Sequence, residues 1–290
     1  MKTGVLLMAH GTPASLSEMP EYLKVVRGGR PPSPELIEEM THNYRSIGGS
    51  PLTDLTLAQG EALARRLGAD VPVAVGMRNW HPYIGVAISE LAAKEVTRII
   101  GLPLAPQFST LSVQKYMDAA AAALLPGMTF VPVRSFHSHP LLLQAFAERV
   151  READPRADEA VVFTAHSLPQ RVIDGGDVYA TEVAETARGV AAQAGIATYD
   201  IAYQSAGRTP EPWIGPELNE FVKAKAAAGA KAILVVPVGF VCDHTEILFD
   251  IDRQATDTAR AAGVALRRTE SLNTSRTFIA ALESIVRAQL

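Results

Sequence analysis

The sequence predicts an α/β protein of two similar Rossmann-like domains, each a parallel sheet flanked by helices, with a cleft between them. Apolar runs of strand length alternate with Ala-rich amphipathic runs along all 290 residues, which is typical of parallel sheets covered by helices. A motif also recurs, because residues 5–13 and 161–169 each lead from an apolar run into Ala-His. A second pair, residues 99–104 and 234–239, repeats in the same order, so a duplicated unit is expected.

The expected elements follow this alternation along the chain. Strands are expected at residues 3–9, 71–77, 97–102, 129–133, 160–165, 198–203, 231–237 and 264–267. Helices are expected at residues 55–67, 84–94, 114–125, 140–152, 180–194, 217–228 and 275–289. A polar stretch at 154–159 divides the expected domains, 1–153 and 154–290, and the last helix could pack on either. The Pro- and Gly-rich residues 27–34 are expected to be neither helix nor central strand.

Composition argues against several classes of protein. The 27 basic and 31 acidic residues nearly balance, with a formal net charge of −4, so nucleic acid is not an expected partner. The sequence shows no signal-peptide layout and no run of about 20 apolar residues, so a cytoplasmic protein without a transmembrane segment is expected. Cys242 is the single cysteine, whereas an all-cysteine iron–sulfur cluster needs four, so no such cluster is expected.

Acidic and imidazole side chains gather directly after the seventh expected strand. Glu246, Asp250 and Gln254 are each four residues apart, which places them on one face of a helix with about 6 Å between steps. Ligands of open α/β sheets bind at the carboxyl ends of the strands, where Asp243 and His244 crowd the same turn. A solvated helix face is the alternative, but carboxylates with imidazole suit a divalent metal or proton transfer.

The recurring Ala-His motif predicts one histidine at the carboxyl end of a strand in each half. His10 and His166 are therefore expected to face the cleft from opposite sides. A single histidine in such a place is more often structural than chemical. Two at matching positions, beside an acidic ladder, favour a functional site.

Six stretches together resemble the ferrochelatase family, and in the family's order they span essentially the whole chain. They are residues 8–13, 47–52, 105–116, 163–169, 203–216 and 236–252. The resemblance implies a chelatase-like fold and an enzyme, a lyase of haem biosynthesis, that inserts ferrous iron into a porphyrin and releases two protons. It implies iron as substrate, with no prosthetic group.

The resemblance also implies roles for the site residues. His166 and Glu246 would be the catalytic pair on one side of the ring, His166 accepting pyrrole protons or binding iron and Glu246 carrying protons or iron beside it. Asp250 would line the path of incoming iron, and the family's outer acid is replaced by Gln254. On the other side, His10 stands where the short bacterial enzymes often have Tyr, and it could ligate the product iron. Further substrate contacts are implied at Arg27, Asn43, Tyr44, Ser50 and Tyr116, with Asn43 in place of a frequent Arg.

The loop at residues 105–116 resembles that of the bacterial enzymes acting on coproporphyrin III, and Arg27 and Arg30 suit a ring with four carboxylates. Coproporphyrin III is therefore the expected substrate, with protoporphyrin IX as the alternative. The protein is expected to be a monomer that makes at most transient contacts with neighbouring haem-pathway enzymes. Two other functions stay open: a porphyrin or haem carrier, and a cobalt or sirohydrochlorin chelatase.

Overall fold

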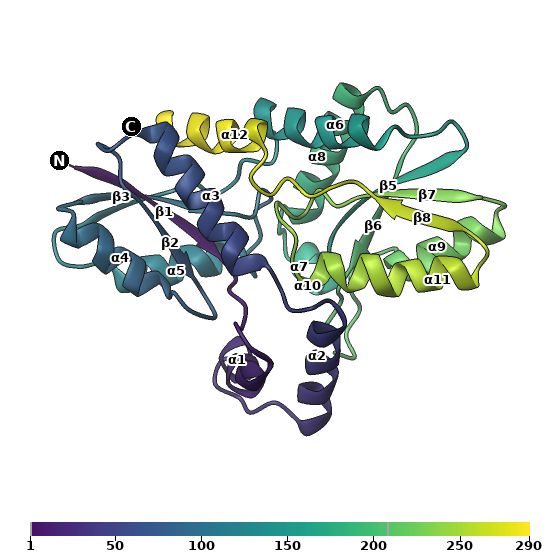
Figure 1. Cartoon of the computed structure of the whole chain (residues 1–290), viewed down its shortest axis with the longest axis horizontal. Coiled ribbons are helices and arrows are strands. Elements are labelled where there is room, and N and C mark those ends of the chain that lie inside the picture. The colour runs from purple at the N-terminus through teal and green to yellow at the C-terminus, as the bar shows by residue number, and fades with distance from the viewer. Residues whose placement is uncertain (1, 208) are drawn as a thin grey trace.

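The computed structural model describes residues 2–207 and 209–290, which form two four-stranded parallel sheets side by side (Figure 1). The first has the order β2-β1-β3-β4 and the second the order β6-β5-β7-β8. The strands are β1 (Thr3–Ala9), β2 (Val73–Met77), β3 (Arg98–Pro103), β4 (Thr129–Pro132), β5 (Glu159–His166), β6 (Asp200–Gln204), β7 (Ala232–Val236) and β8 (Ala265–Arg268). All eight lie close to their predicted positions.

The two sheets repeat one topology. Counting from the first strand of each half, both sheets have the order 2-1-3-4, so β1 corresponds to β5 and β3 to β7. These are the strands that carry the recurring sequence motifs. His10 directly follows β1 and His166 is the last residue of β5, so the duplication predicted from the motifs agrees with the topology.

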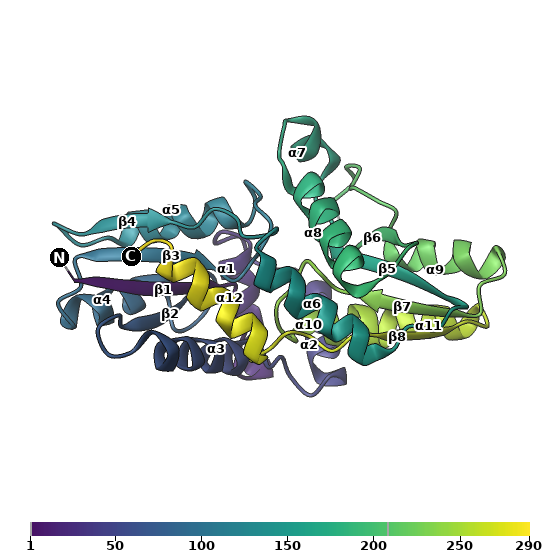
Figure 2. The ribbon, with the colours of Figure 1, turned by 90° about the horizontal axis from the view of Figure 1, so that it is seen from above.

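The helices expected from the sequence are present at slightly different bounds. They are α3 (Leu52–Leu67), α4 (Ile84–Ala93), α5 (Val113–Ala123), α6 (Pro140–Ala153), α8 (Tyr179–Ala194), α9 (Leu218–Ala227) and α12 (Arg276–Arg287). The last of them, α12, packs against α3 and α6, and α6 packs against α8 (Figures 1 and 2). One hydrophobic cluster, which includes Leu63, Phe146, Phe163 and Phe278, therefore joins both sheets through these helices.

Two helices between β1 and α3 were not predicted. They are α1 (Met19–Val26), preceded by the short η1 (Leu16–Glu18), and α2 (Pro34–Ser46), and they extend away from the sheets (Figure 1). The prediction that residues 27–34 contain no helix is wrong at its last residue, because Pro34 is the first residue of α2. Ser33 caps that helix by accepting a hydrogen bond from Leu36 N at 3.3 Å, and proline suits the first helical position because no partner is needed for its missing N–H.

The acidic segment after β7 is not the regular α-helix that was predicted. It consists of α10 (Thr245–Leu248), a π-helical segment (Asp250–Ala255) and α11 (Thr256–Ala261). Gln254 N donates to Phe249 O at 2.9 Å across five residues, which is π-helical bonding. The widened turn breaks the α-helical period, so Glu246, Asp250 and Gln254 do not form one continuous α-helical face. Such widened turns occur often at functional sites.

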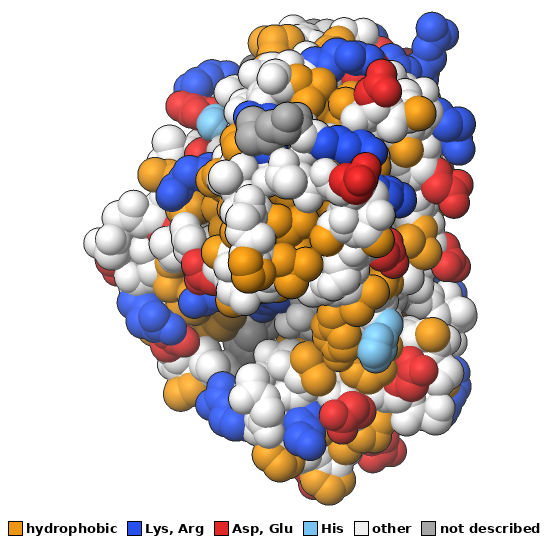
Figure 3. All heavy atoms as spheres, turned by 90° about the vertical axis from the view of Figure 1, so that its left-hand side faces the viewer, with side chains coloured by type: hydrophobic (Ala, Val, Ile, Leu, Met, Phe, Trp, Pro, Cys, Tyr) orange, Lys and Arg blue, Asp and Glu red, His pale blue; other side chains and the backbone are white. Residues whose placement is uncertain are grey.

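The outer face of the first half carries hydrophobic side chains interspersed with charged ones (Figure 3). Across residues 2–207 and 209–290, the helices are all too short or too polar to cross a membrane. The short α7 (Gln170–Asp174) follows β5 and precedes α8 along the chain.

Candidate active site

The carboxyl ends of β5 and β7 bring a histidine and a carboxylate together. Gly239 allows this approach, because a Cβ there would lie 2.7 Å from Cα of Ala165, the residue before His166. The chain after β7 then runs past His244 to Glu246 at the start of α10. Oε1 of Glu246 lies 3.7 Å from Nε2 of His166, and its Oε2 lies 3.9 Å from Nε2 of His244. One carboxylate thus stands between two imidazoles.

Both imidazoles are oriented by main-chain carbonyls. Nδ1 of His166 meets the carbonyl of Ser167, and Nδ1 of His244 lies 3.0 Å from the carbonyl of Cys242. Since a carbonyl oxygen can only accept, each Nδ1 donates to its carbonyl, and Nε2 of each ring lies toward Glu246. The main chain therefore fixes the direction in which each ring approaches the carboxylate.

Glu246 is ionised in this setting. Burial acts to raise the pKa of its carboxyl group, but His166, His244 and His10 outweigh that effect and lower the pKa to about 2. Its side chain keeps 35% exposure to the space between the halves, so solvent can reach the charge. The carboxylate is charged at neutral pH, whereas burial alone would have favoured the neutral acid.

Asp250, the next acid along the chain, has the opposite shift. Burial, followed by the nearby charge of Glu246, raises the pKa of Asp250 to about 7, and the hydroxyl of Ser205 donates a hydrogen bond to it. Ser205 adopts a φ of 60°, the left-handed region that a non-glycine residue rarely occupies. Gln254, in contrast, is exposed. Asp250 can therefore take up and release protons near neutrality between Glu246 and the exposed end of the segment.

His10 faces the same space from the first sheet, since Glu246 raises the pKa of His10 and His10 lowers that of Glu246. Burial dominates for His10 and lowers its pKa, so the ring is neutral near pH 7. Its Nδ1 lies 3.0 Å from Gly11 O and 3.2 Å from the hydroxyl of Tyr22. Its Nε2 lies 2.8 Å from Nδ2 of Asn79.

Two of the other residues predicted to contact the substrate are tyrosines in the protein interior. Tyr44 is buried, with its hydroxyl 2.9 Å from Oγ1 of Thr12, and Tyr116 is buried on α5. Burial raises the pKa of Tyr116 to about 12, with Arg78, whose guanidinium lies 5.5 Å from the ring centre, acting to lower it and Glu246 acting to raise it. Burial raises the pKa of Tyr22, and Tyr44 and Tyr116 raise it further, so the phenols form one group beside His10.

The remaining predicted contact residues, Arg27, Asn43 and Ser50, are more exposed than these tyrosines. Arg27 ends α1 in an exposed position, and Asn43 is half-buried on α2, where its carbonyl accepts from Ser46 Oγ. The hydroxyl oxygen of Ser50 is buried and has no hydrogen-bond partner within the described part of the chain. The structure thus brings His10, His166, Glu246, Asp250, Tyr44 and Tyr116 toward one space.

Sequence reasoning placed His244 in the cluster after the seventh strand but gave no role to Ser205 or Asn79. Ser205 and Asn79 carried no such signal, because each meets its partner through the fold. In the described residues no group of three or more His, Cys, Asp and Glu side chains is arranged to hold one metal ion, so the metal-binding roles stay predictions.

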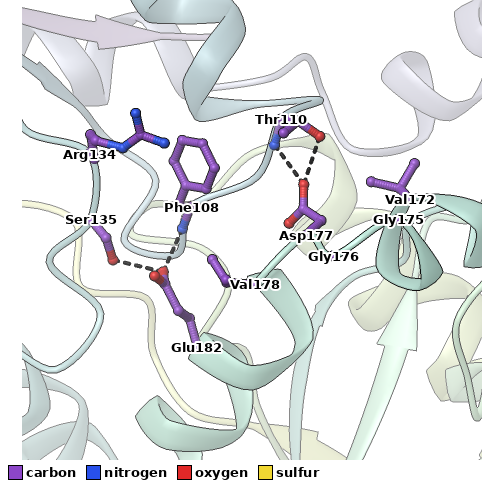
Figure 4. A pocket seen from close by; sticks show the side chains of 10 residues that line it. All are labelled: Phe108, Thr110, Arg134, Ser135, Val172, Gly175, Gly176, Asp177, Val178 and Glu182. Carbon is purple, nitrogen blue, oxygen red and sulfur yellow. Dashed lines mark hydrogen bonds between the residues drawn. The ribbon is translucent and has the colours of Figure 1, made fainter.

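Two cavities have linings that include neither His166 nor Glu246. The larger, of about 370 Å³, lies between the loop that follows β3 and the start of α8 (Figure 4). There Glu182 accepts from Phe108 N at 2.6 Å, and Asp177 accepts from Thr110 N at 2.7 Å, so carboxylates of the second half hold a loop of the first. The smaller, of about 250 Å³, adjoins Tyr44.

Comparisons with known proteins agree with the resemblance found in the sequence. A family profile described as Ferrochelatase matches residues 2–290. A ferrochelatase of Deinococcus radiodurans is 44% identical, with 98% of this chain and 94% of that protein covered. A coproporphyrin III ferrochelatase of Bacillus subtilis is 34% identical, with 100% and 98% covered. The solved structure of SirB from Bacillus subtilis with Fe³⁺ superposes with a TM-score of 0.65 at 12% identity, covering 99% and 95%, which shows a shared fold.

Proposed function

The chain belongs to the ferrochelatase family, the enzymes that insert iron into a porphyrin, and we propose that His166 and Glu246 carry the proton chemistry of that insertion. Insertion replaces two pyrrole N–H protons by one iron ion, so the site must accept protons without losing its attraction for a cation. An ionised Glu246 lying 3.7 Å from Nε2 of His166 meets both requirements, and this observation carries the proposal.

In the proposed mechanism, Nε2 of His166 accepts a pyrrole proton. The resulting imidazolium keeps its Nδ1–H bond to Ser167 O and is stabilised by the charge of Glu246. His244 supports the same carboxylate from its other oxygen. Protons then leave through Asp250, whose pKa of about 7 allows exchange in both directions at neutral pH.

Incoming ferrous iron is proposed to approach along the same segment. Asp250 and Glu246 supply carboxylate oxygens, and His166 supplies a ring nitrogen at the inner end, so an iron ion would meet successive single ligands on its way to the ring. A path of weak sites suits a substrate that has to be released into the porphyrin. The exposed Gln254 at the outer end offers an amide in place of a charge.

We further propose coproporphyrin III as the porphyrin. Full-length relatives with that substrate in their names are 34–36% identical, and they support the proposal. Arg27 and Arg30, both exposed after α1, are available to the carboxylates of such a ring. The relatives at 38–44% identity are named only ferrochelatase, so protoporphyrin IX is the second candidate.

The decisive experiment measures initial rates of anaerobic iron insertion by the purified protein with each porphyrin. We expect a higher kcat/KM for coproporphyrin III, and Glu246→Gln should abolish most of the rate with either ring. A preference for protoporphyrin IX would overturn the substrate proposal while leaving the catalytic pair intact. Full activity of Glu246→Gln would overturn the pair.

The other functions considered have less support. A carrier would not need an ionised Glu246 beside His166, and the likeness to the sirohydrochlorin chelatase SirB, at 12% identity, extends only to the fold. A cytoplasmic monomer stays a prediction.

A further inference from the structure

We propose that Asn79 competes with the product iron for Nε2 of His10, and that this competition promotes release of the metalloporphyrin. The inference rests on the proposed role of His10 as ligand to the product. It concerns which partner Nε2 of His10 has before and after iron is bound.

The hydrogen bonds of His10 determine which of its atoms is available. Gly11 O accepts from Nδ1 at 3.0 Å, so Nδ1 carries the proton of the neutral ring. Nε2 is therefore an acceptor with a single lone pair. Nδ2 of Asn79 lies 2.8 Å away and donates to that lone pair. The same lone pair is the only one with which this tautomer of His10 can bind iron.

Asn79 is held in place by several contacts. Nε of Arg78 donates to Oδ1 of Asn79 at 3.3 Å, which leaves the amide nitrogen facing His10. The main chain adds a second constraint, because Asn79 N donates to His10 O at 2.9 Å. The side chain is only 5% exposed.

Gly11 is what allows this segment to come so close. Its φ of +87° suits glycine, and a Cβ at this position would lie 2.8 Å from Trp80 N. The residues after β2 therefore pack directly against the end of β1. The fold therefore holds the amide of Asn79, which donates to His10, in place.

Two partners for one lone pair exclude each other. To coordinate iron, His10 must first lose the hydrogen bond from Asn79, and the bond can re-form as the metalloporphyrin leaves. The apparent affinity for product is then lowered in proportion to the fraction of molecules with a free Nε2. Among the described residues, the matching atom of His166 faces a carboxylate and no carboxamide.

The test compares Asn79→Ala with the wild-type protein. Removing the donor should tighten binding of ferric coproporphyrin, the air-oxidised form of the ferrous product, roughly 2- to 10-fold, the range expected for one hydrogen bond. Metal-free coproporphyrin has no iron to ligate, so its affinity should stay unchanged. Single-turnover insertion should stay within about 2-fold, while multiple turnover slows wherever product release is limiting.

A second variant predicts the opposite sign. Asn79→Asp keeps the shape but cannot donate, and a carboxylate facing Nε2 favours a proton on that nitrogen. His10 then cannot bind iron, and the affinity for ferric product should fall. In the double variant of His10→Ala with Asn79→Ala, the gain from Asn79→Ala should disappear.

The outcomes distinguish a failure of the inference about Asn79 from a failure of the ligand role of His10. If Asn79→Ala leaves the affinity for ferric product unchanged or weakens it, while His10→Ala weakens it, the inference about Asn79 is overturned and the ligand role of His10 stands. If His10→Ala changes neither affinity nor the absorption spectrum of bound product, both the ligand role and the inference fall. Equal tightening of metal-free and ferric rings would identify a steric effect and overturn the competition.

Discussion

His10 and His166 occupy corresponding ends of two sheets with the same strand order, yet their Nε2 atoms meet different partners. His166 faces the ionised Glu246, whereas His10 accepts a hydrogen bond from a neutral amide. Both rings are held by the same kind of bond, from Nδ1 to a main-chain carbonyl one residue later. The difference teaches that the repeated strand fixes the tautomer and direction of each histidine, while residues from other elements decide its chemistry.

The largest loss of activity is expected from removing the histidine that faces the carboxylate. His166→Ala should abolish iron insertion, because it removes the proposed proton acceptor, whose Nε2 lies 3.7 Å from Oε1 of Glu246. Insertion is measured by anaerobic assay, and circular dichroism checks folding. His10→Ala is the matched control from the other half. Activity of His166→Ala within a few-fold of the wild type would contradict the assignment.

Neutralising the partner of His166 should have the next largest effect. Glu246→Gln keeps size and hydrogen bonding but removes the charge that stabilises the imidazolium, so the saturated insertion rate should fall roughly 100-fold. Because the pKa of Glu246 is about 2, the wild-type carboxylate should stay ionised throughout the working pH range. A loss that appears only at low iron would instead show that Glu246 acts in metal binding alone.

Changes at His10 should affect binding of the product more than the rate of insertion, which would distinguish the two histidines. His10→Ala should weaken binding of the ferric product about 10-fold, or ~1.4 kcal/mol, and slow single-turnover insertion much less. His10→Tyr should change the visible and spin-resonance spectra of bound ferric product, because a phenolate replaces an imidazole. Equal losses in insertion and product binding would remove the distinction between the halves.

The smallest expected effect concerns Asp250 and depends on pH. Its folded pKa of about 7 lies above its usual value, so the stability it contributes is present at acid pH and is lost as the pH rises through 7. Asp250→Asn should therefore raise the melting temperature at pH 8, by about 2–4 °C for each kcal/mol relieved, with little change near pH 4. Calorimetry at the two pH values measures this. A variant less stable at pH 8 would contradict the raised pKa. The insertion rate should fall mainly at limiting iron.

Local patterns in the sequence predicted the eight strands and the repeat, because buried parallel strands are continuous apolar runs bounded by turns. They did not predict α1 or α2, where Pro34 was taken as a barrier to helix although it stands at the first helical position. Four-residue spacing of acids could not reveal the π-helical turn at Asp250–Ala255.

In the site, the partners of the two histidines were likewise beyond what local sequence patterns could predict. The motif identified His10 and His166, the four-residue spacing identified Glu246, and the resemblance paired Glu246 with His166. Asn79 lies 69 residues from His10 along the chain, and contact between them exists only because β1 and β2 pair. The limits of the two domains, 1–153 and 154–290, stay a prediction, since the hydrophobic cluster runs through helices of both halves.

The position of α12 bears on how the protein is made. This helix is synthesised after all eight strands, yet its Phe278 and Leu282 share a hydrophobic cluster with Leu63 of α3 and Phe146 of α6. Nascent chains usually fold from the N-terminus as they emerge. Here the first sheet and its helices would wait, partly uncovered, until α12 has been synthesised, so chaperones that shield apolar surface would have their longest opportunity on the half that is synthesised first.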